Sequence, residues 1–294
     1  MPVRPPFLRR ARLSRPESRA HFRQRQRAAI CALTLSVALA LALAASTQAS
    51  QKVDFFADFS PNRPGASTTV TFGFSITSTN GQAPSPLLDV DLHLPTGIGL
   101  GRNTLGTAIC DPTYLYAYGP GGCPTNSAVG YGTALAVVPY GPRLVQEQAT
   151  VHAYRGMPEA EHITILFLAE GLTPVFADLV FPGQLEEDSG PFGASINTEV
   201  PLVPSLPGGP NVSVVRFQST FGPKHLIYER EVNGELQRFR PRGVTIPVTC
   251  PRGGYPFAAD FSFEDASHIS ARTTVPCAQS AKSRLHRTHG SRHK

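Results

Sequence analysis

Hydrophobic and polar residues alternate along most of the chain after residue 50. In the segment 69–77, Val70, Phe72, Phe74 and Ile76 are separated by small or polar residues. A period of two places successive side chains on opposite faces of a strand, so this pattern predicts a β-strand with one face in a core. Similar alternation, or a β-branched and aromatic composition, recurs in the segments 88–94, 162–169, 174–181, 212–221, 243–249, 255–263 and 268–275. Helical periodicity is rare, and the sequence therefore predicts an all-β fold.

Proline and glycine interrupt these segments at intervals typical of turns between antiparallel strands. Examples are Pro64-Gly65, Asn80-Gly81 and Pro95-Thr96-Gly97. These residues break strand ladders and supply the backbone angles that turns require. We therefore predict an antiparallel β-sandwich for residues 50–277, built as one large sandwich or as two packed sandwiches. The segment 139–142 (Pro-Tyr-Gly-Pro) is the best candidate for an internal seam.

The first 49 residues differ in composition from everything that follows. Nine arginines lie between Arg4 and Arg27, and residues 28–45 form an uncharged apolar run. A basic flank, an apolar core and a small-residue exit ending at Ala49 are typical of a secretory signal peptide. The apolar run is also close to the shortest length that spans a bilayer as a helix. Residues 1–49 are therefore predicted to be a signal peptide or a retained hydrophobic signal-anchor helix, with membrane contact only through residues 28–45 if uncleaved.

The net charge of +6 comes from the two ends of the chain. Residues 50–277 contain 13 Lys and Arg against 20 Asp and Glu. An acidic body offers no basic footprint for nucleic acid, so nucleic-acid partners are excluded. The tail 278–294 is rich in basic and small polar residues and poor in apolar ones. Its composition predicts disorder, because it cannot bury enough apolar surface to become ordered.

Four cysteines follow the N-terminal segment, at positions 110, 123, 250 and 277. An even number of cysteines in an exported chain predicts disulfides. Three pairings are possible, and we favour Cys110–Cys123 and Cys250–Cys277, which join neighbours in the sequence. A zinc site is the alternative, but the spacing lacks the Cys-x-x-Cys pairs that a zinc knuckle uses.

The sequence holds no recognisable catalytic motif. Ser195 lies in Gly-Ala-Ser-Ile-Asn, which lacks the second glycine of a nucleophile elbow. His152 and His162 have aliphatic neighbours, which favours packed or surface histidines over catalytic bases. Phosphate loops, dinucleotide fingerprints and His-Glu-x-x-His motifs are missing. No catalytic residue and no cofactor are therefore predicted.

Acidic residues supply weak candidates for a metal site. Asp89 and Asp91 occupy alternate positions of a predicted strand, so both carboxylates share one face with His93. Such a row can bind a divalent cation, but it is also typical of a polar strand face above a core. The remaining candidates are contiguous in a predicted loop: Glu186, Glu187 and Asp188. Calcium requires six or more oxygens from a shaped loop, so we interpret this cluster as a solvated hairpin tip and predict no metal.

Tyrosines gather in and around the segment between the first two cysteines of the body. They are Tyr114, Tyr116, Tyr118 and Tyr131. A loop held by a disulfide presents aromatic rings rigidly, which lowers the entropy lost on binding. These tyrosines are our candidate ligand-binding residues, and packing over the disulfide is the alternative interpretation.

The order of three motifs resembles that of a known group of proteins. The motifs are Leu94-Pro95-Thr96-Gly97, then Cys110, then Cys123-Pro124-Thr125-Asn126-Ser127-Ala128-Val129-Gly130. This order is similar to the β-rich repeating unit of large uncharacterised surface proteins of high-GC Gram-positive bacteria. The similarity continues through 192–196 and 200–201 and extends to 250–277, so it covers most of the body. The resemblance implies an extracellular β-rich module, and it carries over no catalytic residues.

These features together predict a non-enzymatic secreted or cell-surface module with a structural or partner-binding role. Its expected partner is a cell-envelope polymer or another surface protein. A carbohydrate-binding domain is one alternative, since aromatic side chains commonly stack on ligands. An extracellular hydrolase is a further alternative, and it would require a pocket that joins a His or Ser to a carboxylate.

Overall fold

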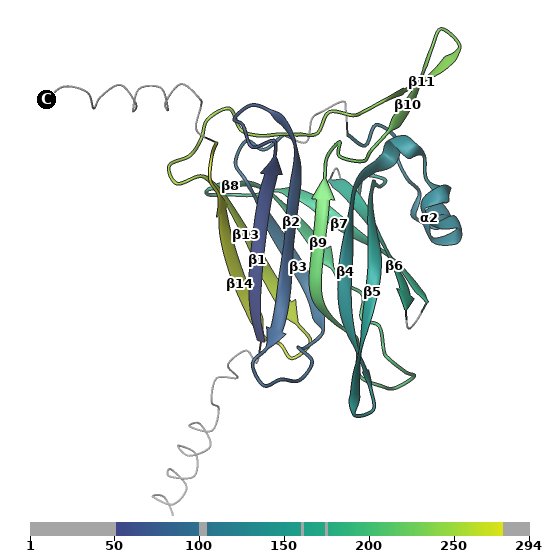
Figure 1. The fold of residues 1–294 in the computed structure, drawn as a ribbon, viewed down its shortest axis with the longest axis vertical. Coiled ribbons are helices and arrows are strands. Elements are labelled where there is room, and N and C mark those ends of the chain that lie inside the picture. The colour runs from purple at the N-terminus through teal and green to yellow at the C-terminus, as the bar shows by residue number, and fades with distance from the viewer. Residues whose placement is uncertain (1–50, 100–104, 160–161, 174–175, 279–294) are drawn as a thin grey trace, which may run out of the picture. The chain divides into compact units, whose positions relative to one another are not determined.

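The protein is described by a computed structural model over residues 51–99, 105–159, 162–173 and 176–278 (Figure 1). The predicted signal segment 1–49 and residues 279–294 of the predicted tail lie outside the described residues. Among the described residues, no helix has the length and apolar character needed to cross a bilayer.

Strands account for most of the described chain, and they confirm the predicted all-β, antiparallel fold. The strands are β1 Gln51–Ser60, β2 Ser67–Ser78, β3 Leu87–Pro95, β4 Ala128–Tyr140, β5 Arg143–Arg155, β6 Ile163–Thr173, β7 Ala177–Glu187, β8 Phe192–Glu199, β9 Ser213–Phe221, β10 Tyr228–Val232, β11 Glu235–Phe239, β12 Val244–Thr245, β13 Tyr255–Phe263 and β14 His268–Val275. Three short helices lie between β3 and β4: α2 Pro112–Tyr118, η1 Gly119–Gly122 and η2 Thr125–Ser127.

Twelve of the strands form one continuous sheet. Its order is β1-β2-β9-β4-β5-β6-β7-β8-β3-β13-β14, and the short β12 pairs with β2. The sheet curls into a nearly barrel-like shape, so that β1, β2, β9 and β4 lie in front of β3 and β7 in Figure 1. The edge strands β1 and β14 lie side by side without a ladder between them. The two layers expected of a sandwich are therefore two sides of a single sheet.

The core lies inside this curl because each strand points every second side chain inward. Strand β13 shows the pattern clearly: Tyr255, Phe257, Phe261 and Phe263 are at most 1% exposed. The ring of Phe59 on β1 packs 5.5 Å from both Tyr255 and Phe257, measured between ring centroids. Each fully buried side chain of this size contributes about 2 kcal/mol through the apolar surface that it removes from water.

The segment 139–142 forms the turn of the β4–β5 hairpin. Val138 pairs with Val145 and Tyr140 pairs with Arg143, so the ladder runs directly into the turn. All described residues belong to one compact unit, and β4 and β5 are neighbours in its sheet. The segment therefore reverses the chain within one sheet and does not separate two sandwiches.

The hairpin β10–β11 lies outside the main sheet and projects from the upper end of the molecule in Figure 1. Its base is fixed by Tyr228, whose side chain is fully buried. The Tyr228 hydroxyl donates to the carbonyl of Ala128 and accepts from the backbone N–H of Gly106 at 2.8 Å. Asn126 adds a two-way bond, since its side chain donates to the Glu229 carbonyl and accepts from the Glu229 N–H.

Candidate functional site: a disulfide-held tyrosine helix

The two disulfides join the cysteines as predicted. Cys110 bonds to Cys123 with their Cα atoms 5.0 Å apart, and Cys250 bonds to Cys277 with their Cα atoms 6.1 Å apart. The first bond closes the loop that carries α2, and the second closes the segment that contains the β13–β14 hairpin. Two disulfides are consistent with an oxidising compartment such as the cell exterior.

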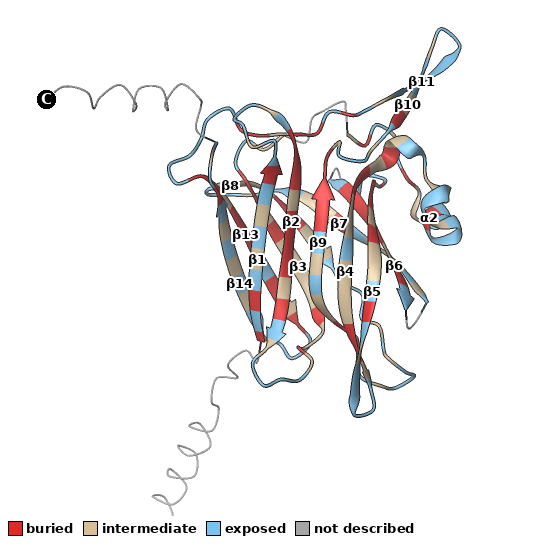
Figure 2. Ribbon diagram, in the orientation of Figure 1, coloured by how far each residue is buried: buried red, intermediate tan, exposed pale blue. Residues whose placement is uncertain are grey.

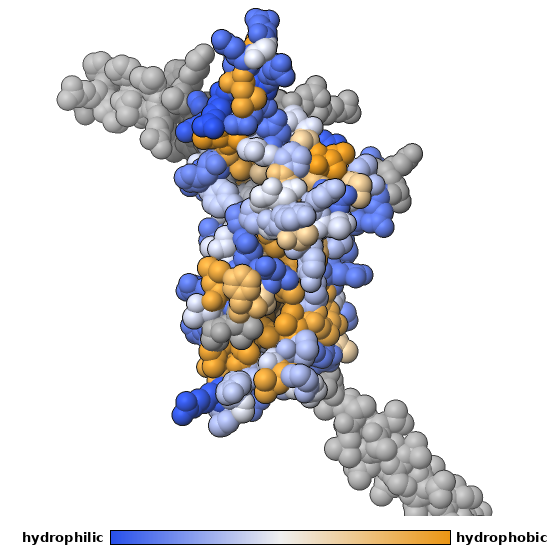
Figure 3. Space-filling model, turned by 90° about the vertical axis from the view of Figure 1, so that its right-hand side faces the viewer, coloured by the Kyte–Doolittle hydropathy of each residue, from blue (hydrophilic) through white to orange (hydrophobic). Residues whose placement is uncertain are grey.

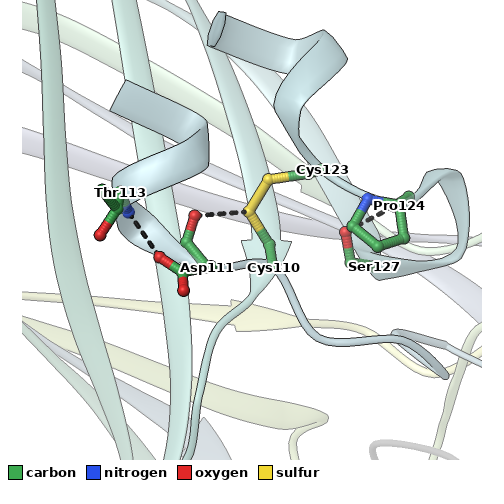
Figure 4. Close-up of a disulfide and its surroundings, with 6 residues drawn as sticks. All are labelled: Cys110, Asp111, Thr113, Cys123, Pro124 and Ser127. Atoms are coloured by element: carbon green, nitrogen blue, oxygen red, sulfur yellow. Dashed lines mark hydrogen bonds between the residues drawn. A yellow bond between two sulfur atoms is a disulfide. The ribbon is translucent and has the colours of Figure 1, made fainter. Parts of the chain in front are cut away.

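Helix α2 is short, and its two ends explain why it forms (Figure 4). Asp111 is the N-cap residue, and its carboxylate accepts a hydrogen bond from the Thr113 N–H at 2.7 Å. Pro112 occupies the first turn, where a missing N–H costs nothing. Gly119 ends the helix with a φ of 60°, which favours glycine. Position 122 must also be glycine, because a Cβ there would lie 2.2 Å from the Tyr114 carbonyl oxygen.

One side of α2 packs against the outer face of the sheet. Leu115 is fully buried, and it forms a small second core with Cys110, Tyr154, Leu166 and Leu168. This core is separate from the main one, because Leu166 and Leu168 of β6 point outward while their neighbours point inward. Burial, with a smaller contribution from the charge of Glu170, raises the pKa of Tyr154 to about 12. The helix is therefore held by a disulfide and by apolar packing.

Three tyrosines of α2 are exposed to solvent (Figure 2). Tyr114, Tyr116 and Tyr118 are 57%, 71% and 69% exposed. The rings of Tyr114 and Tyr118 stack with their centroids 6.2 Å apart and their planes 19° apart. We call these three residues the tyrosine face. The structure thus brings Tyr114 and Tyr118 together, while Tyr116, two residues from each along the same helix, is exposed on a different side of it.

The fourth tyrosine, Tyr131, lies on β4 and is not part of the tyrosine face. It is half-buried, and its ring makes an edge contact with His225 at 5.4 Å. Burial raises its pKa. Tyr131 pairs across the ladder with His152 on β5, so it stands on the same outer face of the sheet but apart from α2. Tyr131 is therefore close to Cys123 in the sequence but not part of the surface that α2 presents.

A polar pair lies beside the end of α2. His152 on β5 and Glu170 on β6 form an ion-pair contact, with Nε2 3.2 Å from Oε2. A Cβ added to Gly119 would lie 3.8 Å from the other Glu170 oxygen, so the helix end approaches this carboxylate closely. Both side chains are partly exposed. The tyrosine face therefore has hydrogen-bonding groups next to it.

His93 is the centre of a second cluster, on the outer face of β3. Its Nδ1 donates to Asp188 at 2.7 Å and its Nε2 donates to Asp260 at 3.0 Å. The Asp91 carboxylate lies 3.7 Å from Nε2, and Phe192 packs against the ring. Both ring nitrogens face carboxylates, which only accept hydrogen bonds when ionised, so the arrangement favours the imidazolium.

The pKa values in this cluster are set by burial and by the neighbouring charges. Burial alone lowers the pKa of His93, but the hydrogen bonds to Asp188 and Asp260 outweigh it and raise the pKa above its ordinary value. Burial is the main reason why the pKa of Asp91 is raised. Burial also acts to raise the pKa of Asp188, yet its bonds to His93 and to the Ser189 N–H lower the pKa overall. His93 therefore acts as a charged cross-link between β3, β13 and the β7–β8 connection.

The cluster brings two of the predicted acidic candidates, Asp91 and Asp188, to one imidazole and leaves the other three apart from it. Asp89 accepts a hydrogen bond from Asn197 at 3.3 Å, and burial raises its pKa. Glu186 and Glu187 end β7 as exposed residues. Across the described ranges, no three or more His, Cys, Asp or Glu side chains converge as metal ligands. Sequence reasoning missed that Asp188 and Asp260 meet His93, because they lie 95 and 167 residues from it.

Ser195 lies on β8 and His162 lies just before β6, and the sequence predicts neither to be catalytic. Ser195 on β8 pairs across the ladder with His93, but its hydroxyl hydrogen-bonds to Asp91. Because both nitrogens of His93 are bonded to carboxylates, this Ser, His and Asp set is not arranged as a nucleophile with its base. His162 is exposed at an isolated bridge with Glu159.

Comparison with protein-family models, with curated proteins and with solved structures finds no match to this chain.

Proposed function

We propose that this protein is an exported, non-enzymatic module of the cell envelope or its surroundings, and that it binds a partner through the tyrosine face. The observation that carries the proposal is the exposure of three tyrosines on a helix that is otherwise fixed. Large exposed aromatic rings cost free energy in water, and they are enriched at binding surfaces.

Rigidity supports this choice of surface. Leu115 is fully buried, the Cys110–Cys123 disulfide closes the loop, and the cap at Asp111 fixes the first turn. A rigid aromatic surface loses little conformational entropy when a partner binds. The disulfides and the N-terminal composition support export, and the resemblance to bacterial surface modules supports a location at the cell surface.

Carbohydrate is the second candidate partner, because the tyrosine face has polar neighbours. Sugar rings stack on aromatic faces while their hydroxyls need hydrogen-bond partners. Glu170 and His152 supply an acceptor and a donor close to Gly119 at the end of α2. This combination favours a polysaccharide of the envelope over an apolar protein surface.

A binding assay with matched variants tests the proposal. Labelled protein is added to envelope material from the organism that makes it and to a glycan array. We expect saturable binding that falls at least tenfold in the double variant Tyr116→Ala and Tyr118→Ala. Tyr140→Ala is the control, since Tyr140 is 60% exposed but lies on the β4–β5 turn. Equal binding by the double variant and the control would overturn the proposal, and binding to envelope without binding to any glycan would exclude the carbohydrate version.

Localisation is tested separately from binding. Surface proteolysis of intact cells, followed by detection of the protein in cells and medium, should find it outside the cytoplasm. Recovery of all of the protein inside protease-protected cells would contradict export.

A further inference from the structure

The interior of the curled sheet contains a cavity that the tyrosine face does not involve. Its volume is about 120 Å³. Six phenylalanine rings form much of its wall: Phe55, Phe72, Phe74, Phe167, Phe181 and Phe217. Folded proteins rarely leave interior spaces larger than a water molecule, so a space of this size calls for an explanation.

Small residues at inward positions create the cavity. Ala134 on β4, Ala169 on β6 and Ala259 on β13 all line it. On β13 the inward residues on either side of Ala259 are Phe257 and Phe261, both of which are buried. On β13, therefore, a methyl group points inward between two large rings.

The wall is fixed by ring stacking and does not collapse into the space. Phe74 stacks on Phe217 with centroids 5.5 Å apart, and Phe167 stacks on Phe181 at the same distance. The two pairs come from four different strands, β2 and β9 for the first and β6 and β7 for the second. The two ring pairs therefore hold the wall from four strands.

The chemistry of the wall selects an apolar occupant. Among its lining residues only Thr198 carries a side-chain polar group, and no charged residue lines it. A buried water needs two to four polar partners, so this cavity does not suit water. A cavity of about 150 Å³ lined by similar side chains takes up benzene or xenon, which sets the scale for a space of about 120 Å³.

The cavity reaches the surface at one end of the sheet. Pro201, which follows β8, lines the cavity and is exposed to solvent. Its neighbour Leu202 is 41% exposed, and Leu172 and Phe176 at the β6–β7 turn are 62% and 76% exposed. Figure 3 shows apolar side chains gathered on the lower half of the face that contains this turn. An apolar molecule that approaches past Pro201 and Leu202 therefore meets apolar side chains.

We propose that this cavity is a binding site for a small apolar ligand, namely one aromatic ring or the short alkyl end of a larger molecule, which enters beside Pro201. This site is independent of the proposed function of the tyrosine face. The ligand contributes no hydrogen bonds to the site, and its affinity comes from apolar surface removed from water.

Benzene is the probe for a calorimetric titration of the purified protein. The wild type is expected to bind one benzene saturably and to gain thermal stability in its presence. Ala134→Leu and Ala169→Leu fill the cavity from two different strands, and each is expected to weaken benzene binding at least tenfold. Thr133→Leu is the control, because it adds the same side chain next to Ala134 on the exposed outer face.

Two results of this titration would count against the site. Absence of saturable binding by the wild type would overturn the proposal, and so would unchanged affinity in the folded filled variants. If neither filled variant folds, NMR of the wild type with benzene decides the matter. Contacts between benzene protons and the rings of Phe181 and Phe217 would support the site, and contacts confined to other residues would contradict it.

Discussion

The interior of the curled sheet is divided into a packed region and a hollow one. In the packed region, Tyr255 and Phe257 on β13 are at most 1% exposed and both contact Phe59. In the hollow region, Phe181 and Phe217 are only half-buried, although they also point inward. Both regions have the same alternation of apolar and polar residues. The difference shows that alternation determines which face is buried, while the sizes of the inward side chains determine whether it is filled.

The cavity has an energetic cost that the packed region does not. Cavity volume lowers stability by about 24 cal/mol per Å³ in comparable cases. An enclosed cavity of about 120 Å³ corresponds to roughly 3 kcal/mol, and the opening beside Pro201 makes this figure an upper bound. A chain that keeps alanines where leucines would stabilise it gives up a large share of a typical folding free energy. Such a cost is commonly found where function opposes stability.

Truncation of one aromatic ring in each region gives the largest expected effect. Phe257→Ala should lower the free energy of unfolding by about 4 kcal/mol, because it opens a new cavity in a filled space. Phe217→Ala should cost less, about 3 kcal/mol, since its ring already borders the existing cavity. Urea denaturation of both variants measures the difference. Equal losses would show that the two regions are packed alike.

Removal of the Cys250–Cys277 bond tests how the packed region is held from outside. The bond closes a loop with a sequence separation of 27 around β13 and β14. Loss of a bond of this span should destabilise the protein by about 3 kcal/mol, mainly because the unfolded chain gains freedom. Urea denaturation of the double variant Cys250→Ser and Cys277→Ser measures the loss. Benzene binding at temperatures where the variant is folded should be unchanged, and its loss would mean that the two regions are not separate.

Protonation of His93 tests the outer face of the packed region. Because the folded pKa is raised above the ordinary value of 6.5, the stabilisation is complete below that pH and is lost as the pH rises through the folded pKa. His93→Gln should therefore cost about 2 kcal/mol near pH 5 and progressively less at higher pH. Denaturation across this pH range, with the exposed His162→Gln as control, measures the trend. A cost that does not change with pH would contradict the charged cross-link.

Adding the same side chain to each region gives the smallest expected effects, which should have opposite signs. Ala134→Leu should raise the free energy of unfolding by about 1 kcal/mol, because it fills existing space. Ala153→Leu should lower it by at least about 1 kcal/mol, because Ala153 is fully buried on β5 in a filled region. Thermal denaturation compares the two. A loss of stability in both variants would mean that the hollow region has no room.

Local sequence patterns predicted much of the secondary structure. Alternation located β2, β3, β9, β13 and β14, because period-two burial leaves a direct trace in the sequence. It missed α2, although Asp111-Pro112 and Gly119 are start and stop signals that mark it. The segment 243–249 forms only the two-residue β12. The exposed hairpin β10–β11 was also missed, because strands with both faces in solvent lack an apolar period.

Features that depend on residues far apart in the sequence could not be predicted from local patterns. The pairing of β3 with β8 and β13 joins residues about 100 and 170 positions apart, and it alone brings Asp188 and Asp260 to His93. The disulfide pairing was predictable because each bond joins sequence neighbours. The cavity was not, because Ala134, Ala169 and Ala259 look like ordinary strand residues until three strands place them around one space.

Crystals of the wild-type protein under xenon pressure test the central claim most directly, because xenon occupies dry apolar cavities and leaves polar ones. We expect a strong xenon peak in the space between the Phe74–Phe217 and Phe167–Phe181 ring pairs, and no peak in the packed region around Phe257. Ordered water in that space, or side chains that close it, would contradict the division of the interior into a packed and a ligand-binding region.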